Sequence, residues 1–222
     1  MISCVIPAWN EGPRIARVAA LAVAHPAIAE VIVVDDGSRD DTAARAAATG
    51  ARVLRQPVNA GKTAAVARGV AEAQGPLLLF LDADLEGLTP ADLDALIAPV
   101  AGARADMSIS LRGNAPGLWR RIGIDYISGE RVLPRALLAP HVNTLTSLPK
   151  FGLEVFMNQL ALAQGYRLAV VGWPGVQSPL KSRKHGFWRG VAGDAGMMAD
   201  MMRTHGPLRL ARQIAGMRRA RV

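Results

Sequence analysis

The hydrophobic pattern of the first half of the chain alternates between short apolar runs and longer alanine-rich stretches. Runs rich in Val, Ile and Leu predict strands, and the stretches between them, with apolar residues at helical spacing, predict helices. The predicted strands are residues 2–6, 30–35, 51–55, 77–81 and 107–111, and the predicted helices are 13–24, 42–49, 63–74 and 90–97. This alternation with short connections favours an α/β fold with a mainly parallel sheet.

The pattern after residue 111 is less regular. Helices are predicted over residues 118–127, 152–164, 191–202 and 208–219, with a short helix after Pro134 and a strand over 166–171. In the first half, Thr89 to Asp92 has the form of a capping box, with Pro90 at the first helical position. We therefore expect a helix to begin at that point.

Polar residues follow each of the first four predicted strands. Ligands of such sheets bind beyond the carboxyl ends of the strands, so these loops predict one binding site at one edge of the sheet. The four polar clusters are Asn10-Glu11, Asp35 to Ser38, Asn59 to Lys62, and Asp82-Ala83-Asp84.

Asp82 and Asp84 end the apolar run 77–81 and are the strongest candidates for chemistry. Residues i and i+2 of a strand project from the same face, so we expect the two carboxylates to point together. Like charges that close repel, and a divalent cation with oxygen ligands relieves the repulsion. The alternative for an isolated Asp-x-Asp motif is a solvated turn after a buried strand.

Composition limits the classes of protein. Half of the 222 residues are hydrophobic and a fifth are charged, which favours a sizeable core over disorder. A lone cysteine, Cys4, excludes a disulfide framework and is expected to be buried. The N-terminus lacks the features of a signal peptide, and the apolar stretch 18–29 is too short to span a bilayer, so the expected location is the cytoplasm.

The formal charge of +8 favours anionic partners, and the excess is concentrated after residue 180. Nucleic acid is disfavoured because aromatic residues do not interleave with the basic ones. The basic C-terminal segment has three interpretations: contact with an anionic membrane surface, closure over a bound diphosphate, or a solvated face. We favour a combination of the first two.

Several individual residues have alternative interpretations. Gly61-Lys62-Thr63 is not a P-loop, because Gln56 stands where that motif needs glycine. Lys62 either neutralises a phosphate or is an ordinary exposed lysine. Asp36 either accepts hydrogen bonds from a base or ribose or forms a tight turn. Trp9 either stacks on a base or covers the core, and we favour the second interpretation.

Four segments together resemble family 2 glycosyltransferases with the GT-A fold, and the order, spacing and context agree over residues 1 to about 110. The segments are Val5 to Glu11 (VIPAWNE), Val33 to Thr42 (VVDDGSRDDT), Asn59 to Lys62 (NAGK), and Phe80 to Asp84 (FLDAD). The resemblance, to small soluble members, implies a three-layer α/β/α fold with a Rossmann-like nucleotide-binding sheet and C-terminal helices. It divides the chain into a glycosyltransferase domain, residues 1–180, and a basic helical tail, residues 181–222. Within the domain, residues 1–110 are the nucleotide-sugar half and 111–180 the acceptor half.

The resemblance also implies a nucleotide-sugar donor whose diphosphate binds through Mg²⁺ or Mn²⁺ at the Asp-x-Asp motif, with Asp84 the more direct ligand and Asp82 beside it. His185 is the nearest substitute for a metal-binding histidine that relatives place near residue 178, although a lone exposed histidine often has no role. The residues implied to bind the nucleotide sugar are Pro7, Ala8, Asn10, Glu11, Asp36, Gly37, Ser38, Lys62, Asp82 and Ala83.

On the acceptor side, Glu154 takes the place of the carboxylate that activates the acceptor, so Glu154 and Asp84 are the implied catalytic residues. Leu153 replaces the first acid of the usual pair, and an acid favoured by the helix dipole is the alternative for Glu154. Glu130 and Arg131 lie in a segment similar to the acceptor region of polyprenyl-phosphate and phosphoglycerate glycosyltransferases. With Glu154 they form the implied acceptor site; a surface ion pair is the alternative for Arg131.

The expected function is metal-dependent transfer of a sugar from a UDP- or GDP-sugar to a hydroxyl or phosphate acceptor, either a small molecule or lipid-linked, in cell-envelope polysaccharide or glycolipid biosynthesis. One alternative is a nucleotide-sugar binder with impaired catalysis. Another is a phosphohydrolase with Asp82 as nucleophile, which is disfavoured because that chemistry usually follows the first strand. Peripheral contact with the inner face of the membrane and a homodimer are both compatible with the sequence.

Overall fold

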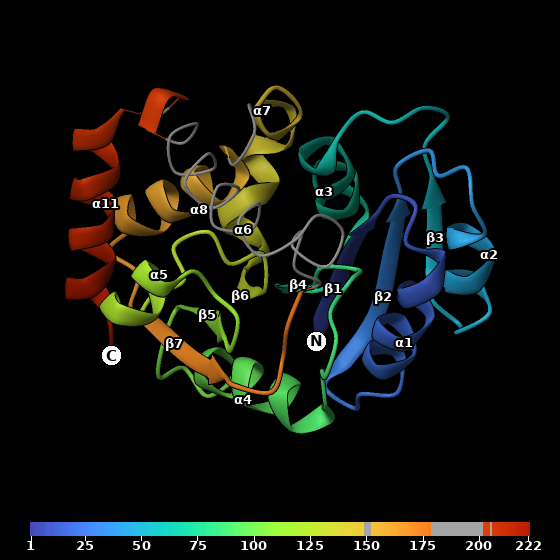
Figure 1. The fold of residues 1–222 in the computed structure, drawn as a ribbon, viewed down its shortest axis with the longest axis horizontal. Helices are drawn as coiled ribbons and strands as arrows, with labels where there is room; N and C mark the ends of the chain where they lie inside the picture. Colours follow the sequence, from blue (N-terminus) through green and yellow to red (C-terminus); the bar gives the residue numbers. More distant parts are fainter. Residues whose placement is uncertain (149–151, 179–201, 205) are drawn as a thin grey trace.

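The computed structural model describes residues 1–148, 152–178, 202–204 and 206–222. The described strands form one sheet of seven strands, in the order β3-β2-β1-β4-β6-β5-β7 (Figure 1). Their bounds are β1 Ile2–Ala8, β2 Ile28–Asp35, β3 Arg52–Arg55, β4 Leu77–Phe80, β5 Met107–Arg112, β6 Arg131–Pro134 and β7 Leu168–Trp173. The longer helices are α1 Gly12–Val23, α3 Lys62–Glu72, α4 Pro90–Ala101, α8 Gly152–Ala163 and α11 Pro207–Ala220. Shorter ones are α2 Thr42–Ala47, α5 Gly117–Ile122, α6 Arg135–Leu138 and α7 Val142–Thr146, with a 3₁₀ turn at Ala139–His141.

The sheet is parallel except at β6. Strands β3, β2, β1 and β4 run parallel to one another, and β5 runs parallel to β7. Strand β6 lies between β4 and β5 and is antiparallel to both, pairing Phe80 with Arg131. The start of β6 therefore lies at the same edge of the sheet as the end of β4.

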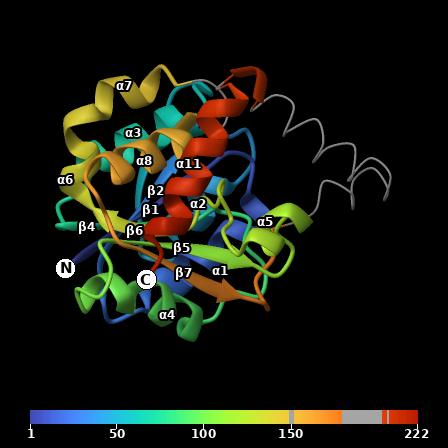
Figure 2. The ribbon, with the colours of Figure 1, turned by 90° about the vertical axis from the view of Figure 1, so that its left-hand side faces the viewer.

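Helices cover both faces of the sheet, which gives the expected three layers (Figures 1 and 2). Successive residues of β1 pack into two hydrophobic cores on opposite faces of the sheet. Val5 packs with α3 on one face, and Cys4 and Ile6 pack with α1 on the other. Helices α6, α7, α8 and α11 lie on the same side as α3, and α4 lies with α1 (Figure 2). Helix α2 packs against α1. Such burial on both faces is typical of parallel strands with nearly continuous apolar runs.

The elements predicted up to residue 111 are confirmed, with ends that move by a few residues. The capping box at Thr89 is also confirmed: its hydroxyl accepts from the Asp92 amide, and the Asp92 carboxylate accepts in return from the Thr89 amide. Cys4 is fully buried, as expected.

The second half contains corrections. The predicted helix 118–127 is wrong beyond Ile122, because Gly123 takes a left-handed conformation that ends α5. Strand β6 and helix α7 were not predicted, because each is only a few residues long. The predicted helix 191–202 falls almost entirely outside the described residues.

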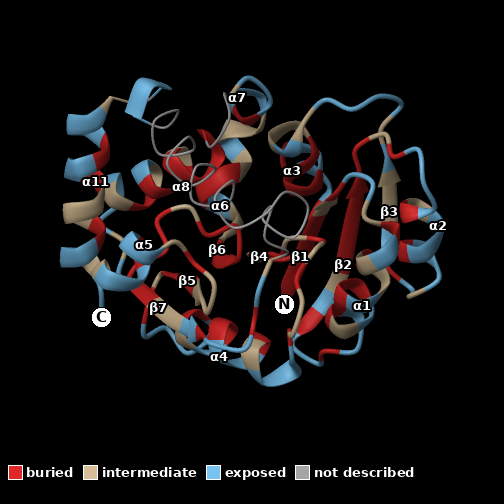
Figure 3. Ribbon diagram, in the orientation of Figure 1, coloured by how far each residue is buried: buried red, intermediate tan, exposed pale blue. Residues whose placement is uncertain are grey.

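Helix α11 lies within the predicted tail, residues 181–222, and its inner face packs against α8 in the core. Leu210 and Met217 are buried in the cluster that also contains Met157 and Leu153 of α8. The opposite side of α11 is exposed (Figure 3). Within the described part of the chain, every helix is too short or too polar to cross a membrane.

Candidate active site

A cavity of about 380 Å³ lies at the carboxyl edge of the parallel strands. All four polar loops predicted to meet at this edge contribute to it. Its lining is Pro7, Ala8, Trp9, Glu11, Asp36, Asn59, Gly61, Lys62, Ala65, Asp82, Ala83 and Asp84. Asn10, Gly37 and Ser38 line an adjoining hollow, which shares Trp9 and Asn59 with the cavity.

Hydrogen bonds join the loop after β1 to the loop after β2. The backbone N–H of Asn10 donates to Ser38 Oγ at 2.9 Å, and the side-chain Oδ1 of Asn10 accepts from the backbone N–H of Arg39 at 2.9 Å. The Glu11 amide donates to Thr42 Oγ1 at 2.8 Å. Asn10 and Ser38 therefore position these loops against each other.

Asp36 fixes the third loop. Its two carboxylate oxygens accept from the amides of Ala60 and Gly61, each at 2.8 Å, and one also accepts from Gln56 Nε2 at 2.9 Å. The carboxylate is almost fully buried at the cavity wall. In this state Asp36 holds the segment that leads into α3 and Lys62.

Trp9 corrects one prediction. Its side chain is 54% exposed and lines both hollows, so the interpretation that it covers the core is wrong. An exposed indole at a cavity mouth provides a flat apolar surface on which a ring can stack.

The two aspartates of the Asp-x-Asp motif both line the cavity, as expected, but not for the expected reason. Strand β4 ends at Phe80, so Asp82 and Asp84 lie in the following turn, where strand alternation does not apply. The turn places both carboxylates at the same cavity.

Asp82 and Asp84 differ in their electrostatic surroundings. Burial alone would raise the pKa of Asp82, but the charges of Lys62 and Arg112 outweigh it and hold that pKa below its usual value. Burial raises the pKa of Asp84 to about 6, and the negative charges of Asp82 and Glu11 add to the effect. Asp84 therefore lies where a cation would be favourable.

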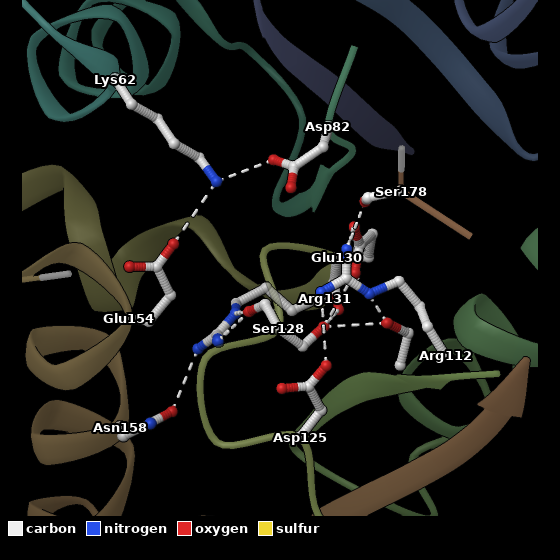
Figure 4. Close-up of polar contacts among 11 residues, drawn as sticks. Lys62, Asp82, Arg112, Asp125, Ser128, Glu130, Arg131, Glu154, Asn158 and Ser178 are labelled. Atoms are coloured by element: carbon white, nitrogen blue, oxygen red, sulfur yellow. Dashed lines mark hydrogen bonds and ion pairs between the residues drawn. The ribbon is translucent and has the colours of Figure 1, made fainter. Parts of the chain in front are cut away.

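Lys62 links the two sides of the site. Its Nζ lies 2.7 Å from Asp82 Oδ1 and 3.4 Å from Glu154 Oε1 (Figure 4). Burial alone would lower the pKa of Lys62, but the charges of Asp82 and Glu154 outweigh it and raise that pKa. Glu154 lies in the first turn of α8, and neighbouring Leu153 is buried in the core.

Gly129 forms the wall behind this ion pair. A Cβ at this position would lie 2.8 Å from Asp82 Oδ1 and 3.0 Å from Lys62 Nζ. Only glycine allows the backbone to approach the two charged groups so closely.

The predicted acceptor residues Glu130 and Arg131 are fully buried next to Gly129. Arg131 Nε donates to the Ser128 carbonyl, and its Nη1 donates to Asn158 Oδ1, both at 3.1 Å (Figure 4). Glu130 accepts from Ser110 Oγ at 2.8 Å and from Ser128 Oγ at 3.0 Å. Both side chains are therefore buried behind the cavity, where their hydrogen bonds hold the segment around Gly129 in place.

Sequence reasoning missed Arg112, Asp125 and Asn158. Arg112 lies 3.4 Å from both Glu130 and Asp125, and also donates to Ser178. Its position directly after an apolar strand is the same signal that identified Asp82, but its partners come from distant segments. His185 lies outside the described residues.

The residues present fit a hard divalent cation. No group of three or more His, Cys, Asp or Glu side chains gathers as a metal site in the described segments. Mg²⁺ and Mn²⁺ do not need one, because Mg²⁺ commonly binds through one or two carboxylates together with substrate phosphates and water. Asp84, with Asp82 beside it, supplies that kind of donor set at the cavity.

The fold and this cavity define a glycosyltransferase domain of the GT-A type. Structures of glucosyl-3-phosphoglycerate synthase from Mycobacterium tuberculosis resemble it. The complex with Mg²⁺ and UDP has a TM-score of 0.65 at 28% identity, covering 86% of this chain and 77% of that one. The complex with Mn²⁺, UDP-glucose and phosphoglyceric acid has a TM-score of 0.62 at 27% identity, with the same coverage.

Residues 3–145 match the family described as Glycosyl transferase family 2, and the chain belongs to this family. It is 33% identical over 123 residues to dodecaprenyl-phosphate galacturonate synthase from Rhizobium johnstonii, covering 51% of this chain and 36% of that protein. It is 37% identical over 108 residues to glucosyl-3-phosphoglycerate synthase from M. tuberculosis, covering 45% and 33%. The matches span about a third of the length of these relatives.

Proposed function

We propose that this protein transfers a sugar from a nucleotide diphosphate sugar to an acceptor with the help of Mg²⁺ or Mn²⁺. The observation that carries the proposal is the single cavity that brings together Asp84, Asp82, Lys62 and the loops after β1 and β2. A UDP-sugar is the favoured donor, because the similar mycobacterial structure was solved with Mn²⁺ and UDP-glucose.

The donor's base and ribose are assigned to the pocket between Trp9, Asp36 and Ser38, and its diphosphate to the region of Asp84 and Lys62. Transfer builds negative charge on the departing diphosphate. A bound cation supplies Lewis-acid stabilisation of that charge, and the Lys62 ammonium adds a second positive group from the protein.

Glu154 is assigned as the general base that orients the acceptor hydroxyl and takes its proton. It stands across Lys62 from Asp82, so the acceptor would enter between α8 and the donor. Glu130 and Arg131 are assigned to the acceptor side, where their buried contacts shape the wall around Gly129. A phosphate-bearing acceptor, small or lipid-linked, suits the net positive charge of the chain.

Helix α11 gives the proposal of peripheral membrane contact a specific location. Arg209, Arg212, Arg218, Arg219 and Arg221 are all exposed, and residues 202–222 contain no acidic residue. An anionic bilayer surface would attract this face.

Thermal unfolding with UDP or GDP, each with and without Mn²⁺, tests the donor site. We expect a nucleotide to stabilise the protein only when Mn²⁺ is present, and Asp84→Asn to abolish this effect. Asp94→Asn is the matched control, because Asp94 is 72% exposed on α4. Equal stabilisation of wild type and Asp84→Asn would contradict the proposal.

The alternative of a binder with impaired catalysis is favoured by Leu153, which lies in the core where relatives carry an acid. Hydrolysis or transfer of UDP-glucose by the wild type, lost in Glu154→Gln while nucleotide affinity is kept, would exclude it. Nucleotide binding without any turnover would favour it.

A further inference from the structure

The ligand-free protein carries its own cation at the centre of the site. Lys62 Nζ touches Asp82 Oδ1 at 2.7 Å and reaches Glu154 Oε1 at 3.4 Å (Figure 4). Asp82 belongs to the Asp-x-Asp motif, and Glu154 is the proposed base. One ammonium group therefore pairs with both a candidate cation-facing acid and the acid assigned to the acceptor.

The surroundings keep the ammonium in this position. Gly129 closes the wall, with its virtual Cβ within 3.0 Å of both Asp82 and Lys62 Nζ. With the Lys62 ammonium 2.7 Å from Asp82 Oδ1, the carboxylate already has a positively charged partner, which weakens its attraction for a second cation. The Lys62 side chain is 43% exposed, so it can turn toward the cavity.

We propose that Lys62 is a built-in counter-ion that competes with a metal cation for Asp82 until the donor's diphosphate draws the ammonium away, so that cation binding depends on the nucleotide. This inference rests on the proposed function. A diphosphate carries more charge than either carboxylate alone and offers Lys62 a stronger partner. A single movement of Lys62 then exposes Asp82 Oδ1 to the cation and releases Glu154 to meet the acceptor.

The coupling between nucleotide and cation arises from the charge of Lys62. With Lys62 paired to it, Asp82 attracts a cation weakly. Without Lys62, the cavity holds Asp82, Asp84 and Glu11, with Glu154 nearby and no ammonium between them. Coupling between two ligands is reciprocal, so a nucleotide that moves Lys62 must raise cation affinity by the same factor as the cation raises nucleotide affinity.

The test is Mn²⁺ binding by electron paramagnetic resonance, without nucleotide, in the full chain. We expect Lys62→Met to bind Mn²⁺ at least about fivefold more tightly than wild type. Lys62→Arg, which keeps the charge, should stay close to wild type. Arg68→Met is the matched control, because it removes one positive charge from an exposed position of the same helix.

A second measurement compares the Mn²⁺ affinity of the wild-type protein saturated with uridine and the Mn²⁺ affinity of the same protein saturated with UDP. Uridine lacks the diphosphate, so it should leave the Mn²⁺ affinity of the wild type unchanged. Equal Mn²⁺ affinity of wild type and Lys62→Met without nucleotide would overturn the inference, and so would a rise with uridine alone. If UDP and Mn²⁺ fail to bind together at all, the proposed function fails instead. If Lys62→Met does not fold, Lys62→Gln, which also removes the charge, takes its place in the comparison without nucleotide.

Discussion

Asp82 and Asp84 lie two residues apart in the turn after β4, yet their surroundings shift their pKa values in opposite directions. Asp82 has an ammonium partner at 2.7 Å, whereas Asp84 is half-buried among other acids. In the free protein Asp82 is therefore paired with a cation, whereas the negative charge of Asp84 is unfavourable. A cation at Asp84 would offset that charge.

Asp84→Asn should stabilise the cation-free protein at neutral pH. The folded state holds the Asp84 proton up to pH about 6, whereas the ordinary pKa is 3.8. Between these values the folded state binds more protons, so stability falls as pH rises through this window. The gain from asparagine should therefore be present above pH 6, at most about 3 kcal/mol, and absent below about pH 4. Urea denaturation across this range checks it, and a gain that does not change with pH would contradict it.

Gly129→Ala should impair the site more than the fold. The added Cβ would displace either the Asp82 carboxylate or the Lys62 ammonium, because it would lie within 3.0 Å of both. We expect UDP affinity in the presence of Mn²⁺, measured by calorimetry, to change by at least about threefold, because the Lys62–Asp82 pair cannot keep its present geometry. Gly117→Ala is the control, because a Cβ there meets nothing within 4 Å. Unchanged UDP affinity would show that the close approach is dispensable.

The residues that sequence reasoning found are those with a local signal. Asp82 and Asp84 end an apolar run, and Asp36 and Lys62 lie in polar loops after strands. Asp125 and Asn158 gave no such signal, and the local signal of Arg112 did not reveal its role, because the partners of all three lie 13 or more residues away in the sequence. Trp9 was misplaced, because an indole in a loop has the same sequence pattern whether it faces the core or a ligand.

At the scale of elements, the first half was predictable because each βα unit repeats the same signals of apolar run, polar loop and alanine-rich helix. The second half lacks this repetition. Strand β6 has only four residues, Arg131–Pro134, and begins with a charged residue and ends with proline, so its pattern does not indicate a strand. Residues 131–134 form a strand because they pair with β4 on one side and with β5 on the other.

Helix α11 offers a matched test of whether the basic C-terminal segment belongs to the domain. Leu210 is 5% exposed in the core, and Leu208 on the same helix is 73% exposed. Leu210→Ala should lower the free energy of unfolding by about 2–4 kcal/mol, and Leu208→Ala should change it by less than about 0.5 kcal/mol. Chemical denaturation of both variants checks this. Equal small effects would mean that α11 is not part of the cooperative core.

For the whole molecule, the net charge of +8 is unevenly distributed. Arg209 of α11 donates to Gln159 of α8, while Arg212, Arg218 and Arg219 are exposed on the same helix. The Arg221 guanidinium reaches the Gly123 carbonyl at the end of α5, which itself carries exposed Arg120 and Arg121. The α5–α11 side of the molecule is therefore strongly basic, and it lies at the opposite end of the sheet from β3 (Figure 1).

Binding to anionic vesicles should depend on this side. The triple variant Arg212→Gln, Arg218→Gln and Arg219→Gln should bind vesicles containing phosphatidylglycerol at least about tenfold more weakly than wild type, because each arginine near such a surface contributes about 1 kcal/mol. The control removes three exposed arginines from α1, α2 and β3: Arg17, Arg45 and Arg52. Co-sedimentation measures both. An equal loss in the two triple variants would indicate a general charge effect and contradict a specific face.

The direction of β6 also bears on how such a protein can diversify. Because β6 runs opposite to β4, the connection that enters β6 lies beside the turn that holds the aspartates. Changes at the exposed positions of this connection can therefore act on the Asp82 turn through Gly129, while strands β1 to β4 keep their sequence. Libraries confined to these positions are the natural starting point for changing the acceptor of the proposed transfer.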